Sequence, residues 1–407
     1  MKSTVEREFG IDLVRVARVV MLVELVALLV STSAVVVGEL LLYALFLGSG
    51  VLRRRLWATF TQPMVKMTWL WGGLVLLAAL YCVGTPAEAL DGLGKWRKIL
   101  LLPMAAALFD EAVWKRRFLW TMVLAAALGV TLSYLGWVSG VTIANNGPGF
   151  VIINYATQGV MFAVSLFALV LMARYAPPAQ PGWRWFLGGT GVAIFANLIF
   201  ITPGRSGYLA LLLLAVVAAF FLVSPRVRYL AALATALALG VLLFFSPVAN
   251  QRIRQGVSEI NTYDKSTELT SMGIRRYMWS NTIKMIEARP LLGVGTGGFA
   301  EGYRQQVAGQ AGWQGQPVGD CHNQYLRVMA EQGVVGLLVF LVLLGSFFRQ
   351  PVGMPYRIIG LGVLLSWCAT SLVNSHFSNF MEGRFIFLWC GALLAMPAQP
   401  DRSDPAA

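Results

Sequence analysis

The chain has 407 residues, of which 57% are hydrophobic and only 13% are charged, and its formal net charge is +13. Its apolar runs repeatedly reach the roughly 20 residues that a helix needs to cross a bilayer, which excludes an ordinary soluble globular protein. The runs are continuous instead of alternating, so they favour helices over the strands of a membrane barrel. We therefore expect an all-α polytopic membrane protein.

Apolar runs in chain order predict about twelve membrane-spanning helices. They cover residues 15–33, 35–50, 64–84, 97–112, 118–140, 150–173, 185–202, 207–223, 229–248, 324–348, 356–373 and 384–397. The first two runs contain Glu24 and Glu39, and they are also compatible with one bent segment followed by a re-entrant piece.

Basic residues gather on one side of this twelve-span arrangement. They are Lys2, Arg7, Arg15, Arg18, Arg53, Arg54, Arg55, Lys115, Arg116, Arg117, Arg174, Arg184, Arg226, Arg228, Arg349 and Arg357. By the positive-inside rule this side is cytoplasmic, so both termini are expected to be cytoplasmic. Because orientation in the membrane accounts for most of the basic residues, the charge indicates a lipid bilayer as partner and no nucleic acid.

Three regions follow from this topology. Residues 1–248 form a transmembrane bundle of about nine helices, residues 249–321 a long periplasmic segment, and residues 322–400 a second bundle of about three helices. Within the periplasmic segment, residues 274–288 have the apolar pattern of an amphipathic helix that ends at Arg289 and Pro290.

A glycine-rich stretch, residues 293–299, follows this helix. It matches the GxGxxG dinucleotide pattern, but no strand precedes it. A turn that brings the backbone close to the bundle is the favoured interpretation. The segment has no acidic cluster, and the four cysteines are scattered, so we expect neither a metal nor a cofactor.

His322 is one of two histidines and lies where this polar segment meets an apolar run. A histidine at the start of a helix stays neutral near pH 7 and can act as a base. The alternative is an interfacial imidazole that only caps the helix. Asp320 or the helix backbone could orient the ring, and Asn323 is a suitable N-cap.

Three arginines are candidates for binding phosphate. Arg205 lies in a tight outer turn, and Arg275 and Arg276 open the amphipathic helix. Guanidinium groups bind phosphate oxygens bidentately and keep their charge, which suits a lipid pyrophosphate at a membrane surface. Snorkelling or a structural ion pair remains the alternative for each of them.

Other polar residues near the outer face have both structural and functional interpretations. Arg327 and Glu331 are spaced to pair on one helix face, and Gly333 with Gly336 permits close helix packing. The candidates for lining the substrate site are His376, Arg384, Tyr303 and Trp313. For His376 a hydrogen-bonded loop histidine is the favoured alternative, and for Tyr303 and Trp313 it is loop anchoring.

Several of these motifs together resemble the O-antigen ligase family of glycosyltransferases. One motif is His322-Asn323, nine residues, Gly333, two residues and Gly336; another is Arg205, three residues and Leu209. A third is Arg275 with Trp279, followed by the sequence Pro-Leu-Leu-Gly-Val-Gly at residues 290–295.

The resemblance implies a GT-C-like enzyme of the bacterial inner membrane with its active site facing the periplasm. Its donor would be O-antigen on undecaprenyl pyrophosphate, its acceptor a sugar hydroxyl of lipid A-core oligosaccharide, and its reaction a metal-independent inverting transfer. In this scheme His322 is the base, supported by Asp320, and Arg205 and Arg275 bind the pyrophosphate. Arg276 is the alternative to Arg275 if the register differs by one.

Three other functions stay open. An O-antigen polymerase uses the same donor, and a protein O-oligosaccharyltransferase shares the histidine motif. The latter usually carries extra outer sequence after its last spans, whereas this chain ends soon after its final apolar run. A lipid-linked-sugar transporter would also have many helices, but it would place acidic residues along a pathway across the membrane.

Overall fold

The computed structural model describes residues 12–144, 147–152, 155–261 and 271–397. Helices are the regular elements of these ranges, and no strand occurs in them. The prediction of an all-α membrane protein is thus confirmed in its coarse form. Both chain ends, with Lys2 and Arg7, lie outside the described residues.

Five of the described helices are long and apolar enough to cross a membrane. They are α8 (Ala112–Ser139), α9 (Tyr155–Tyr175), α11 (Arg205–Leu222), α12 (Arg228–Phe245) and α16 (Gln324–Phe347). A sixth crossing results if α3 (Thr32–Gly48) and α4 (Gly50–Ala58) are one broken span, because the chain bends by 96° between them. The predicted number of twelve is not reached by helices of this length and composition.

The remaining bundle helices are shorter or less apolar than these five. They are α2 (Leu13–Val30), α5 (Pro63–Ala79), α6 (Pro86–Trp96), α7 (Leu101–Leu108), α10 (Pro181–Phe200), α17 (Tyr356–Thr370) and α18 (Phe380–Leu393).

The predicted span at 97–112 differs most from the structure. Helical structure there begins at Pro86, passes through a 3-10 turn at Arg97–Leu100 and ends at Leu108. Helix α7 alone is only about 12 Å long. All eight of its residues are buried by protein.

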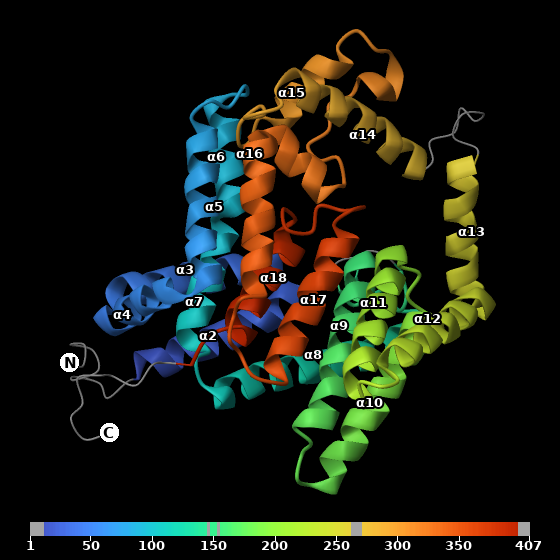
Figure 1. The fold of residues 1–407 in the computed structure, drawn as a ribbon. Helices are drawn as coiled ribbons and strands as arrows, with labels where there is room; N and C mark the ends of the chain where they lie inside the picture. The colour runs from blue at the N-terminus through green and yellow to red at the C-terminus, as the bar shows by residue number, and fades with distance from the viewer. Residues whose placement is uncertain (1–11, 145–146, 153–154, 262–270, 398–407) are drawn as a thin grey trace.

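The segment after α12 folds over one end of the bundle. It contains α13 (Pro247–Asn261), α14 (Ser271–Ala288), α15 (Phe299–Val307) and the 3-10 turn η3 (Gly312–Gly315). In Figure 1, α14 and α15 lie together beyond the upper end of α16. They share a small core with the chain around Cys321 and Ala330. Helix α14 confirms the predicted amphipathic helix and its end before Arg289.

Candidate functional site

The N-terminus of α16 carries the principal candidate residue. The side-chain oxygen of Asn323 accepts hydrogen bonds from the backbone N–H groups of Tyr325 and Leu326 at 3.0 and 3.1 Å, so the predicted N-cap is confirmed. His322 precedes it with a φ of 55°, and no other non-glycine residue of the described chain has a positive φ. Such backbone strain is kept only where surrounding contacts hold it, and it is common at functional sites.

Helix α16 is interrupted at Gly333, and residues 290–295 fill the interruption. The N–H groups of Val294 and Gly295 donate to the carbonyls of Ala330 and Glu331 at 2.9 and 2.8 Å. On the other side of the kink, the N–H of Val334 donates to the Pro290 carbonyl at 2.8 Å. An inserted segment thus replaces the helix's own hydrogen bonds.

The two glycines of this junction explain why the motifs occur together. Gly333 has a φ of 67°, and a Cβ there would lie 2.1 Å from the Leu291 carbonyl oxygen. Gly295 has a φ of 86°, and its Cβ would lie 2.5 Å from the Cα of Cys82. The prediction that the glycine-rich stretch lies close to the bundle is confirmed. The junction ties the outer segment rigidly to α16.

Asp320 is held by three groups beside His322. Its carboxylate accepts a hydrogen bond from the Ser375 hydroxyl at 2.6 Å and another from the backbone N–H of His322 at 3.3 Å, and it lies 3.3 Å from the Arg327 guanidinium. Arg327 also contacts Glu331 at 3.6 Å, as their spacing predicted. The distance from Asp320 to His322 Nδ1 is 3.7 Å, too long for a hydrogen bond.

His322 itself has the properties of a base that is neutral near pH 7. Its side chain is 46% exposed, so it is accessible to a substrate. Burial of the rest of the ring lowers its pKa from the usual 6.5. The positive charges of Arg275 and Arg327 also lower this pKa, while Asp320 opposes them. The neutral, proton-accepting form is therefore favoured.

Helix α14 positions Arg275 toward His322. Trp279, one turn after Arg275, donates its indole N–H to the carbonyl of Cys321 at 2.8 Å and so anchors α14 to the residue before His322. Arg275 is half-buried, and its charge acts on the His322 ring. Arg276 is exposed and does not contribute to the pKa shift of His322.

A loop at residues 371–379 connects the His322 region to the turn that carries Arg205. Asn323 donates a side-chain hydrogen bond to the Leu372 carbonyl at 2.9 Å, and Asn374 donates one to Ser206 at 3.0 Å. Arg205, next to Ser206, is half-buried and donates from Nε to the Arg252 carbonyl at 3.1 Å. The same loop thus contacts the neighbours of both candidate residues.

The four residues proposed to line the site differ in accessibility. Trp313 is partly exposed and packs edge-to-face on Tyr277 at 5.1 Å. Tyr303 is buried against Phe299, which favours the packing role. Arg384 is 2% exposed and binds Glu39 through two nitrogens at 2.6 and 3.1 Å, which favours a structural role.

His376, the fourth of these residues, is 5% exposed. Neither of its ring nitrogens has a hydrogen-bond partner in the described chain. The favoured interpretation, a loop histidine hydrogen-bonded by its neighbours, thus has no side-chain or backbone partner to support it among the described residues. Burial lowers its pKa, and the negative charges of Glu382 and Asp320 oppose that shift.

Comparison with known proteins assigns this region to a family. Residues 190–341 match the family model described as O-Antigen ligase. This part of the chain is an O-antigen ligase family domain. The matched range contains Arg205, Arg275, Asp320 and His322 but not His376. In addition, 96 residues are 31% identical to an uncharacterized protein of Haemophilus influenzae, covering 23% of this chain and 24% of that protein.

Metal ligation has no obvious basis in the described part of the family domain or the rest of the described chain. No group of three or more His, Cys, Asp or Glu side chains there could hold an ion. All four cysteines are free, and burial raises the pKa of Cys321 to about 12. His322, Asp320 and Arg327 provide acid–base and electrostatic groups at the site.

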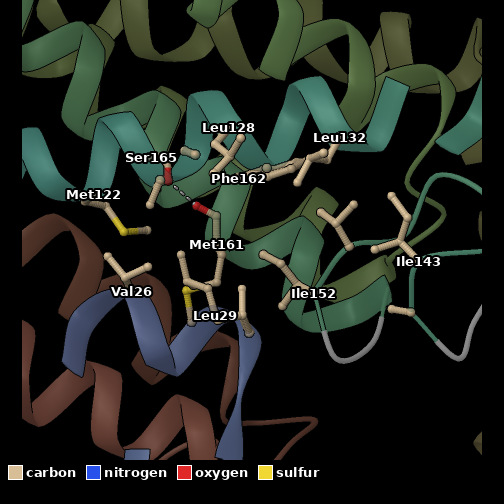
Figure 2. A pocket seen from close by; sticks show the side chains of 16 residues that line it. Val26, Leu29, Met122, Leu128, Leu132, Ile143, Ile152, Met161, Phe162 and Ser165 are labelled. Atoms are coloured by element: carbon tan, nitrogen blue, oxygen red, sulfur yellow. Dashed lines mark hydrogen bonds between the residues drawn. The ribbon is translucent and has the colours of Figure 1, made fainter. Parts of the chain in front are cut away.

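An apolar cavity of about 480 Å³ lies between α2, α8 and α9. Figure 2 shows Val26 and Leu29 of α2 facing Met122 of α8 and Met161 of α9. The one labelled hydroxyl, on Ser165, is bonded to the Met161 carbonyl. No residue of the His322 region lines this cavity, so it is separate from the candidate site.

Sequence reasoning missed Ser375, which holds Asp320 from 55 residues away. It also missed Gln324, whose side chain both accepts from the Ser378 backbone N–H and donates to the Ser378 hydroxyl. The sequence did contain a signal, because residues 374–379 are polar apart from Phe377 and lie between two apolar runs. Nothing in that run indicated which of its residues would face Asp320.

Proposed function

We propose that the protein is an O-antigen ligase. It transfers O-antigen polysaccharide from undecaprenyl pyrophosphate to a sugar hydroxyl of lipid A-core oligosaccharide. The observation that carries the proposal is the match of residues 190–341 to the O-antigen ligase family, since that range includes His322 and the candidate arginines. His322 also supports the proposal, because its side chain is accessible and its neutral form can accept a proton.

In the proposed reaction, His322 is the general base. The acceptor hydroxyl oxygen attacks the anomeric carbon of the donor while the hydroxyl proton moves to the His322 ring. The bond from that carbon to the pyrophosphate oxygen breaks on the opposite face, and undecaprenyl pyrophosphate leaves with the electron pair. A positioned base of this kind contributes about 10² to 10⁴-fold to the rate.

Arg275 and Arg205 stabilise the leaving pyrophosphate in this proposal. Pyrophosphate is already a good leaving group, so charge neutralisation is more useful to it than protonation. Arg275 is preferred over Arg276 because its charge already acts on His322. Arg205 lies at the first position of α11, where the helix dipole adds positive potential.

The cellular arrangement belongs to the same proposal. The chain is placed in the bacterial inner membrane with a GT-C-like bundle of about twelve crossings, both termini cytoplasmic and His322 facing the periplasm. The cover of α14 and α15 over the end of α16 supports a site on that outer face. The division of the chain into two membrane bundles, residues 1–248 and 322–400, and the outer segment 249–321 follows from the same topology.

Reconstitution of the purified protein in nanodiscs tests the function. Lipid-linked O-antigen and lipid A-core are incubated with it in EDTA, and the products are separated by gel and identified by mass spectrometry. A ligated product that is absent with His322→Ala is expected. Elongation of the donor alone would identify a polymerase instead, and movement of donor across vesicles without a covalent product would identify a transporter.

A further inference from the structure

His376 is a buried imidazole without a hydrogen-bond partner in the described chain. A neutral imidazole has one donor nitrogen and one acceptor nitrogen. Leaving both unpaired in the interior destabilises the folded protein. An apolar ring would pack in the same place without this cost, so we expect the nitrogens of His376 to bind a partner.

The neighbour of this ring also has an unpartnered polar atom. The Trp367 indole lies 5.6 Å from the His376 ring, centroid to centroid, and its N–H has no partner among the described residues. Adjacent buried side chains with unpartnered nitrogens form a typical site for an internal water molecule, which bonds to two to four polar groups.

The neighbours of His376 connect it to the candidate base. Ser375, the preceding residue, donates to the Asp320 carboxylate at 2.6 Å. The Asp320 carboxylate in turn accepts a hydrogen bond from the backbone N–H of His322 and lies 3.7 Å from Nδ1 of its ring. On the other side, Glu382 of α18 accepts a hydrogen bond from Thr157 at 2.7 Å. These two carboxylates are the charged groups that act on His376.

We propose that His376 is a positioning residue that binds the Asp320 carboxylate through an internal water and thereby controls how strongly Asp320 attracts a proton onto His322. This role rests on the proposed function, because it supposes that His322 is the base. His376 does not touch the substrate. By stabilising the Asp320 carboxylate, His376 weakens the attraction of this carboxylate for the protonated His322 ring. His322 therefore stays neutral near pH 7.

The direction of the effect follows from electrostatics. The Asp320 carboxylate raises the pKa of His322, while Arg275 and Arg327 lower it. A hydrogen bond that the water bound to His376 donates to Asp320 weakens the attraction of that carboxylate for the imidazolium form of His322. Removing the donor should therefore raise the pKa of His322 and move the acid limb of the activity profile to higher pH.

The chain's two histidines make the measurement direct. Protein labelled with ¹⁵N-histidine, purified without a polyhistidine tag, contains only two imidazoles. In His376→Phe the remaining signal is His322. Its pKa should rise by about half a unit or more compared with the wild-type protein. His376→Asn and His376→Gln keep an amide donor in place of Nδ1 or Nε2, and at least one of them should restore the wild-type value.

A double-mutant cycle tests whether Asp320 carries the effect. In an Asp320→Asn background, His376→Phe should no longer change the pKa of His322. A His322 pKa that stays within about 0.2 unit in His376→Phe would overturn the proposal. So would a shift that persists without the Asp320 carboxylate. The titration needs no substrate, so absence of ligation by the wild-type protein would refute the proposed function and leave this result interpretable.

Discussion

Two clusters of charged side chains in this protein are built differently. In the inner cluster, Glu39 is bound by Arg384 at 2.6 Å and by Arg97 at 3.2 Å, and both Glu39 and Arg384 are almost completely buried. In the outer cluster, Asp320 contacts Arg327 at 3.3 Å and the His322 ring at 3.7 Å, and the His322 side chain remains 46% exposed.

The difference separates stabilising charges from reactive ones. Charges inside a membrane bundle are costly unless they are paired, so the inner cluster uses its hydrogen-bonding capacity within the protein. The outer cluster is looser, and it includes a strained residue, His322, which reaches solvent. Residues of the inner cluster should therefore affect stability, and those of the outer cluster should affect the rate of transfer.

Replacement of His322 by Ala is expected to have the largest effect. Loss of the general base should lower the ligation rate by about 10² to 10⁴-fold at pH 7.5. The measurement is the initial rate of product formation in nanodiscs with saturating donor. The thermal unfolding temperature should stay close to that of the wild-type protein. A rate within threefold of wild type would mean that His322 only caps α16.

Arg384→Gln should instead lower stability. It leaves Glu39 buried without its main partner, which typically costs about 3–5 kcal/mol. Thermal unfolding in detergent measures the loss, and the matched double variant Glu39→Gln with Arg384→Gln should recover part of it. The fraction that folds should ligate at nearly the wild-type rate. If ligation were lost at unchanged stability, Arg384 would line the substrate site after all.

Arg275→Lys and Arg276→Lys form a matched pair of neighbouring substitutions. Both keep the charge but lose the bidentate geometry of guanidinium. A lost charge-assisted hydrogen bond corresponds to a decrease of about 10 to 100-fold in kcat/KM, and this is expected for Arg275→Lys only. Equal losses in both variants would show that the outer segment binds pyrophosphate through its overall charge.

Local features of this protein were predictable from sequence. The cap at Asn323, the Arg327–Glu331 pair and the helix at 274–288 depend on residues within a few positions of each other. The glycine-rich stretch was predictable because only a glycine-rich backbone can approach another backbone so closely.

Features that depend on distant contacts were not predictable in the same way. The apolar run at 97–112 suggested a crossing, but α7 is short and surrounded by protein, and composition does not distinguish burial in protein from burial in lipid. The hydrogen bond from Ser375 to Asp320 and the unpartnered His376 arise from the fold of the 371–379 loop. Sequence spacing contains no information on which way that loop turns.

The pH dependence of ligation is the smallest effect and tests the electrostatics of the outer cluster. Since the pKa of His322 is lowered, kcat/KM should be constant at neutral pH and fall as the pH drops through the lowered pKa. Arg275→Gln removes a charge that lowers this pKa, so the acid limb should move to higher pH by about half a unit. Asp320→Asn removes the charge that raises it, so the limb should move to lower pH.

These opposite shifts distinguish base catalysis from a loss of binding. A variant that only binds pyrophosphate more weakly lowers the plateau of kcat/KM without moving its acid limb. Arg275→Gln should do both, because its charge acts on His322 as well as on the proposed donor. If Asp320→Asn and Arg275→Gln moved the limb in the same direction, the group that titrates would not be His322. The inner cluster provides the control, since conservative changes at Arg97 should leave the limb unmoved.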